Sequence, residues 1–138
     1  MALFRPPKER LIQKAHPLLG LLEFDPDSEG WVTRMPGQPI RFVIGGDTAP
    51  DPLLMESAAR VLQRHNAFLH DMALFLERCT SEQPLHADEI RRLVASDVCF
   101  LWPQRPESAM VFFSGPNVSH VWHCDYDAGG LAYLVFDS

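Results

Sequence analysis

The chain has 138 residues, of which 46% are hydrophobic and 22% charged, a composition that excludes a disordered or fibrous protein. A chain of this length buries roughly 68% of its unfolded surface, so one hydrophobic core suffices and we expect one domain. The formal net charge is −6, and no Lys or Arg lies between residues 108 and 138. This part of the chain would repel a phosphate backbone, so we expect no nucleic-acid partner.

The cysteines and the distribution of apolar residues indicate a cytoplasmic protein. Cys79, Cys99 and Cys124 are odd in number and have no CxxC spacing, which argues against both a disulfide framework and a zinc ribbon. No apolar run approaches the roughly 20 residues of a spanning helix, and the first residues lack the apolar centre of a secretory signal. We therefore expect a cytoplasmic location and no membrane partner.

Residues 1–17 are predicted to be a basic amino-terminal extension, followed by three antiparallel strands. The first strand covers residues 18–24 and is followed by DPDSEG, a segment rich in residues that form tight reversals. Large and polar side chains alternate over residues 31–35 and again over 40–44, with Pro36-Gly37 as the turn between them. These strands form a meander.

A long amphipathic helix is the strongest structural signal in the sequence. Asp51 supplies an N-cap acceptor, and Pro52 takes the first helical position, where its missing N–H costs nothing. Apolar residues then recur at three- and four-residue spacing from Leu54 to Cys79. The pattern predicts one helix of roughly 28 residues, about 40 Å long, which crosses the whole sheet and could bend near Asn66.

A short second helix over residues 87–94 and four more strands complete the predicted fold. The strand segments are rich in aromatic and β-branched residues and are separated by turn-forming segments. They cover residues 98–102, 109–113, 120–126 and 131–136. Strands, then helices, then strands predict an α+β fold, with an antiparallel sheet packed on the long helix in a single domain over residues 18–138.

The order of these elements resembles that of small bacterial domains of unknown function, some of which are immunity-like proteins. The resemblance extends from about residue 18 onward. It rests on the strand meander, the DTAPDPLL segment before the long helix, the EIRRLVASDVCF segment and the terminal strands. It implies a fold and a protein partner, and it brings no catalytic residues.

The densest polar cluster, HVWHCDYD, covers residues 120–127 and invites a metal interpretation. His120, His123 and Asp127 would be the ligands of a small-ligand or metal-dependent enzyme. On a strand, however, alternation places the two histidines on opposite faces. A catalytic zinc ion needs about three protein ligands, so further ligands would have to come from elsewhere. We predict no metal and no cofactor.

Nucleophilic catalysis is also not favoured by the sequence. Cys124 adjoins His123, but neighbouring strand residues point to opposite faces, so the imidazole could not readily take the proton of the thiol. The sequence contains no HExxH, GxSxG, GxGxxG or GxxxxGK[ST] motif. We therefore favour a non-enzymatic protein and predict no catalytic residues.

The carboxy-terminal hairpin is the predicted partner-binding surface. Its candidate contact residues are three aromatic and two acidic side chains: Trp122, Tyr126, Tyr133, Asp125 and Asp127. Aromatic anchors with an acidic rim fit a basic protein partner, such as a cationic nuclease or toxin.

The sequence leaves three alternatives to this interpretation open. Part of the hairpin's aromatic side chains could belong to the core, with the acids serving only to keep the surface soluble. The chain could be the enzyme centred on residues 120–127. It could also be a structural homodimer subunit that pairs through a sheet edge or the aromatic face.

Overall fold

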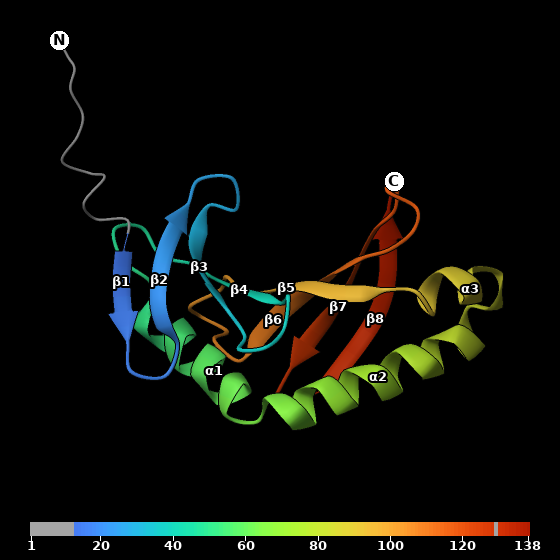
Figure 1. Ribbon diagram of the computed structural model, residues 1–138, viewed down its shortest axis with the longest axis horizontal. Coiled ribbons are helices and arrows are strands. Elements are labelled where there is room, and N and C mark those ends of the chain that lie inside the picture. Colours follow the sequence, from blue (N-terminus) through green and yellow to red (C-terminus); the bar gives the residue numbers. More distant parts are fainter. Residues whose placement is uncertain (1–12, 129) are drawn as a thin grey trace, which may run out of the picture.

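Eight strands form one sheet and follow one another across it in chain order (Figure 1). The computed structural model describes residues 13–128 and 130–138. The strands are β1 (Gln13–His16), β2 (Gly20–Asp25), β3 (Gly30–Arg34), β4 (Arg41–Ile44), β5 (Val94–Phe100), β6 (Ser108–Ser114), β7 (Val121–Asp127) and β8 (Gly130–Asp137). All neighbouring pairs are antiparallel except β4 and β5, which are parallel. The predicted α+β fold with an antiparallel sheet is confirmed, apart from this one parallel pair.

The helices connect β4 to β5 and lie together on one side of the sheet (Figure 1). They are α1 (Pro52–Gln63), α2 (His65–Glu82), the 3-10 turn η2 (Pro84–His86) and α3 (Ala87–Ile90). Parallel strands cannot be joined by a tight turn, so this helical segment serves as the crossover between them. In the described part of the chain, none of these helices is long and apolar enough to cross a membrane.

The long helix predicted from the sequence is divided at Arg64 into α1 and α2. The start is as expected: the Asp51 carboxylate accepts hydrogen bonds from two backbone N–H groups of the first turn, and Pro52 begins α1. At Arg64 the backbone leaves the helical region, with φ −121° and ψ 39°. The break lies two residues before Asn66, where a bend was anticipated. Two shorter segments follow the twist of a sheet better than one straight rod does.

The other differences from the predicted boundaries lie around β5 and β1. The third helix ends at Ile90, and β5 begins at Val94, four residues before the strand that was predicted. A β-bulge between Ala95 and Asp97 interrupts the alternation that would have marked this start. Residues 13–16 of the predicted extension form β1 and pair with β2, whereas residues 1–12 lie outside the described residues.

The core lies between the helices and one face of the sheet. Strands β3, β4, β5 and β7 and helix α2 contribute large side chains that are almost fully inaccessible: Trp31, Phe42, Phe100, Trp122 and Phe68. Burial of each such side chain contributes about 1.5–3 kcal/mol relative to leaving it in water. On the opposite face, no described helix covers the sheet (Figure 1).

An ion-pair network on this uncovered face joins the two halves of the sheet. Arg41 of β4 is the register partner of Asp97 of β5, and its Nε lies 2.7 Å from the Asp97 carboxylate. The same guanidinium reaches the Asp25 carboxylate at 3.4 Å and the Ser28 hydroxyl at 3.2 Å. The hydrogen bond to Asp97 is the main reason that the pKa of Arg41 is raised. The network therefore fixes the junction between β4 and β5.

Replacing Arg41 by Met should lower the free energy of unfolding by about 1 kcal/mol, measured by urea denaturation. Hydrogen bonds to charged groups contribute about 1.5–3 kcal/mol, and partial exposure of this pair reduces that value. The matched control is Arg34→Met, because Arg34 is exposed and pairs with Arg41 in the register. Within the described residues, its side chain bonds only the Pro39 carbonyl. Equal losses in the two variants would show that the junction does not depend on the network.

Candidate functional site

The carboxy-terminal hairpin of β7 and β8 forms one edge of the sheet, because β8 is the last strand in the order. The two strands pair in register from Asp127 and Gly130 at the turn, and Ala128 enters this turn with a positive φ of 47°. Tight reversals of this kind use the left-handed region, in which side-chain-bearing residues are uncommon.

Two of the five predicted contact residues are buried and cannot meet a partner. Trp122 is inaccessible, and its indole N–H donates a hydrogen bond of 2.7 Å to the Glu89 carboxylate. Tyr126 is 6% exposed and packs edge-on against the ring of Phe68 at 5.4 Å. The alternation in β7 was interpreted correctly, but the aromatic face is the one that the helices cover. Trp122 and Tyr126 therefore leave the candidate partner surface.

The other three predicted contact residues are exposed. Asp125 lies on the uncovered face of β7, and Asp127 lies at the end of this strand. Tyr133 of β8 is 77% exposed. Tyr133 has φ 63°, in the left-handed region that non-glycine residues rarely adopt. It lies at a β-bulge, where three steps along β8 match two along β7. A strained backbone of this kind costs about 1–3 kcal/mol and marks the position as unusual.

The predicted metal ligands do not come together. The ring of His120 stacks on Phe136 at 4.0 Å on the helix side of the sheet, whereas His123 lies on the opposite face and contacts Asp137 at 3.1 Å. Asp127 is exposed at the end of β7. Within residues 13–128 and 130–138, no group of three His, Cys, Asp or Glu side chains could hold a metal ion. His120, His123 and Asp127 are therefore not one site.

A carboxylate that the sequence did not reveal organises the buried end of β7. Glu89 of α3 accepts hydrogen bonds from the indole of Trp122 and, at 2.8 Å, from Nδ1 of His120. Partial burial acts to raise the pKa of Glu89, but these two hydrogen bonds outweigh it, so the pKa lies below its ordinary value. The partners lie about thirty residues apart, and no local pattern links them. Glu89 satisfies an indole N–H that would otherwise be buried without a partner.

The cysteines are poor nucleophiles in this fold. All three are buried. Burial raises the pKa of both Cys99 and Cys124 to about 12, and it also raises that of Cys79. The thiolate is the reactive form of cysteine, and at neutral pH it is scarcely populated at these positions.

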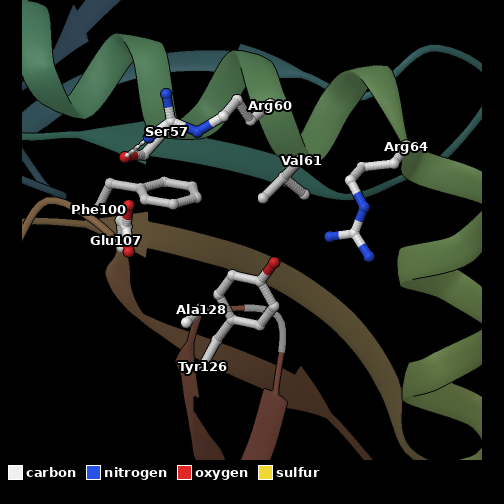
Figure 2. Close-up of a pocket in the computed structure, with 8 residues that line it drawn as sticks. All are labelled: Ser57, Arg60, Val61, Arg64, Phe100, Glu107, Tyr126 and Ala128. Carbon is white, nitrogen blue, oxygen red and sulfur yellow. Dashed lines mark hydrogen bonds between the residues drawn. The ribbon is translucent and has the colours of Figure 1, made fainter.

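A pocket of about 440 Å³ lies between α1 and the turn of the hairpin (Figure 2). Its walls come from α1, the end of β5, the loop before β6 and the hairpin: Ser57, Arg60, Val61, Arg64, Phe100, Glu107, Tyr126 and Ala128. Figure 2 shows the hydroxyl of Tyr126 and the guanidinium of Arg64 pointing into the same space. Tyr126, which was predicted as a partner contact, is thus a pocket residue. The sequence does not distinguish the two arginines, because they occupy solvent-facing positions of an amphipathic helix.

Comparison with known proteins adds no family to this geometry. No family model, no curated protein and no solved structure matches the chain. The resemblance to immunity-like bacterial domains therefore stays an expectation.

Replacing Glu89 by Gln should destabilise the protein at pH 7 by about 1 kcal/mol, since the carboxylate accepts two hydrogen bonds in a partly exposed setting. A pKa that is lowered in the folded state adds stability above the ordinary value of 4.5, and that stability is lost as the pH falls through the folded value. The difference between wild type and variant should therefore shrink below about pH 4.5, measured by urea denaturation across pH.

The control for Glu89→Gln is Asp88→Asn, which removes the neighbouring carboxylate. Asp88 is exposed and, among the residues that the structure describes, pairs only with Arg91 on the surface, so its loss should change stability by less than about 0.5 kcal/mol. A gap between wild type and Glu89→Gln that stays constant from pH 7 to pH 3 would contradict the role given to the ionised carboxylate.

The native protein should react very slowly with the thiol reagent DTNB at pH 8. With a pKa of about 12, roughly one thiol in ten thousand is ionised at that pH. Addition of denaturant should release all three thiols at the rate of an ordinary cysteine. Rapid labelling of one thiol in the native state would reopen nucleophilic catalysis.

Proposed function

We propose that the chain is a non-enzymatic protein-binding module that engages a basic partner through its carboxy-terminal hairpin. The observation that carries the proposal is Tyr133, an aromatic side chain that is 77% exposed and held in a left-handed backbone conformation. Aromatic residues of this kind dominate the binding energy of protein interfaces. Strain in an exposed segment that the core does not require supports a role in recognition.

The charge around Tyr133 supports a basic partner. Asp125, Asp127 and Asp137 are exposed on the two strands of the hairpin, and no Lys or Arg lies between residues 108 and 138. Charges of one sign speed the encounter with an oppositely charged protein and reject like-charged ones. An immunity-like role, with a cationic toxin or nuclease as the partner, is the specific form of this proposal.

The position of β8 in the sheet supports an extended segment as the part of the partner that binds. An outer strand presents backbone donors and acceptors to which another strand can add. The Gln83 side chain bonds the Leu134 carbonyl at 2.8 Å, so α2 secures one point of this strand. Val121 and Val135, each 48% exposed on the uncovered face, offer apolar contact beside the acids.

The charge of the hairpin disfavours the homodimer, and the geometry of β7 disfavours the enzyme. Antiparallel pairing of two β8 strands would bring acidic hairpins together, and like charges across a strand pair are destabilising. An enzyme centred on His120, His123 and Asp127 would need side chains from opposite faces of the sheet. We place the module in the cytoplasm, in keeping with its three buried, unpaired cysteines.

Tyr133→Gly should separate recognition from folding. Glycine adopts a positive φ without strain, so the free energy of unfolding should stay unchanged or rise by up to about 1 kcal/mol. Affinity for the partner should fall about thirtyfold, as expected for an interface anchor worth about 2 kcal/mol. Stability is measured by urea denaturation. Affinity is measured by titration with the lysine–valine peptide KVKVKV and with the product of a neighbouring gene.

The controls distinguish binding that depends on charge and position from nonspecific binding. Asp125→Lys should weaken binding and reduce its dependence on salt. Leu85→Ser, at an even more exposed apolar residue outside the hairpin, should leave binding unchanged. The glutamate–valine peptide EVEVEV should not bind. Binding that survives both Tyr133→Gly and Asp125→Lys would refute the proposed surface. A concentration-dependent dimer that these substitutions disrupt would instead support the homodimer.

A further inference from the structure

The pocket between α1 and the hairpin turn differs in charge from the acidic hairpin beside it. Two arginines, Arg60 and Arg64, project from successive turns of α1 over the pocket (Figure 2). The apolar floor of the pocket is formed by two buried side chains, Val61, which projects from the same helix between the arginines, and Phe100 at the end of β5 (Figure 2). Cationic groups above an apolar floor suit a ligand that has a negative group on an apolar body.

The two ends of the pocket are not equally balanced in charge. At one end Arg60 donates a hydrogen bond of 3.1 Å to the Ser57 hydroxyl, and Glu107 lies on the same side, next to Phe100 (Figure 2). Among residues 13–128 and 130–138, neither arginine has a carboxylate within ion-pair distance. Because Glu107 lies on the side of Arg60, the less compensated positive charge is that of Arg64 (Figure 2).

The Tyr126 hydroxyl is a second, independent feature of the Arg64 end. Only 6% of the surface of Tyr126 is exposed, and its ring packs edge-on against that of Phe68. In the part of the chain that the structure describes, the phenolic oxygen makes no hydrogen bond and points into the pocket (Figure 2). Since no fully buried side-chain oxygen of the described residues lacks a hydrogen-bond partner, this hydroxyl is accessible from the pocket. A ligand in the pocket can therefore take the place of water as its partner.

We propose that this pocket binds a small organic oxyanion, a carboxylate or a phosphate monoester on an apolar body. The planar guanidinium of Arg64 donates to the oxyanion, because its fork matches the geometry of carboxylate and phosphate oxygens. The Tyr126 hydroxyl donates to the same group. The apolar body lies over Val61 and Phe100, and Arg60 with Glu107 receives the polar far end. The proposal does not rest on partner binding at the hairpin.

Helix geometry alone does not account for this arrangement. Cations near the carboxy-terminal end of a helix are favourable without any ligand, and this explains the presence of arginine at the end of α1. It explains neither the unpartnered Tyr126 hydroxyl nor the apolar floor between the two charged ends. Arg60 and Arg64 also repel one another at their four-residue spacing, and an anion between them relieves this cost.

The test is a titration of the full chain, followed through the amide resonances of the pocket residues, with five probes. Phenyl phosphate and benzoate carry the oxyanion on an apolar body; inorganic phosphate carries the charge alone; benzamide and benzylamine are the neutral and cationic counterparts. Phenyl phosphate, benzoate or both should give saturable shifts around Val61 and Tyr126 below about 10 mM, and which of them binds identifies the oxyanion. Inorganic phosphate should bind at least about tenfold more weakly. Benzamide and benzylamine should not bind.

Three pocket variants and a control establish which groups are responsible. Arg64→Gln should weaken binding about tenfold, Tyr126→Phe about threefold to tenfold, and Arg60→Gln less than Arg64→Gln. Arg64 is exposed and Tyr126→Phe keeps the ring on Phe68, so both variants should fold. The control is Arg78→Gln, at an exposed arginine of α2 that pairs with Glu82 away from the pocket. It should leave binding unchanged.

Several outcomes would overturn the proposal. The first is no saturable shift with either apolar oxyanion up to about 10 mM. A second is equal binding of inorganic phosphate and phenyl phosphate, which would show that the apolar floor does not contribute to binding. A third is loss of binding in Arg78→Gln as large as that in Arg64→Gln, which would reduce the effect to net charge.

Discussion

The parallel pairing of β4 and β5 is the constraint on which the rest of this structure depends. Without it the chain would form two separate antiparallel meanders, each with a further free edge. The junction is held on both faces of the sheet. On the helix side the rings of Phe42 and Phe100 meet edge-on at 6.2 Å, and on the other side Arg41 bridges to Asp97 and Asp25. Because parallel strands require a long crossover, this junction also dictates the layer of helices.

The crossover explains why the two proposed binding regions occur where they do. Helix α1 packs against β4 and β5, so its last turn reaches the hairpin turn at the same end of the sheet and forms the pocket. Helix α2 continues beneath the carboxy-terminal strands to β8, where Gln83 secures the edge strand. The helices thus cover the aromatic side of β7 and leave the acidic side of the hairpin open.

Much of the fold was predictable from the sequence, because strand alternation and helix capping are local signals. Asp51 and Pro52 gave the start of α1, and the period of two in β7 correctly grouped Trp122 with Tyr126. Alternation cannot decide which face is covered, so these residues were mistaken for exposed contacts. The parallel junction, the carboxylate of Glu89 beside Trp122 and the pocket all join residues that lie far apart in the chain. Such contacts leave no periodic trace in a single sequence.

The pocket and the hairpin are close enough in the chain to be coupled by charge. Ala128 lines the pocket and directly follows Asp127, one of the acids proposed to meet a basic partner. An oxyanion bound at Arg64 would neutralise a positive charge that otherwise repels that partner. The partner would then strengthen oxyanion binding by the same factor, because coupling between two sites is reciprocal. Screening over about 8 Å at physiological salt keeps this coupling modest and makes it decrease as salt is added. Opposite charges on these neighbouring surfaces would therefore favour joint occupation of the two proposed sites over competition between them.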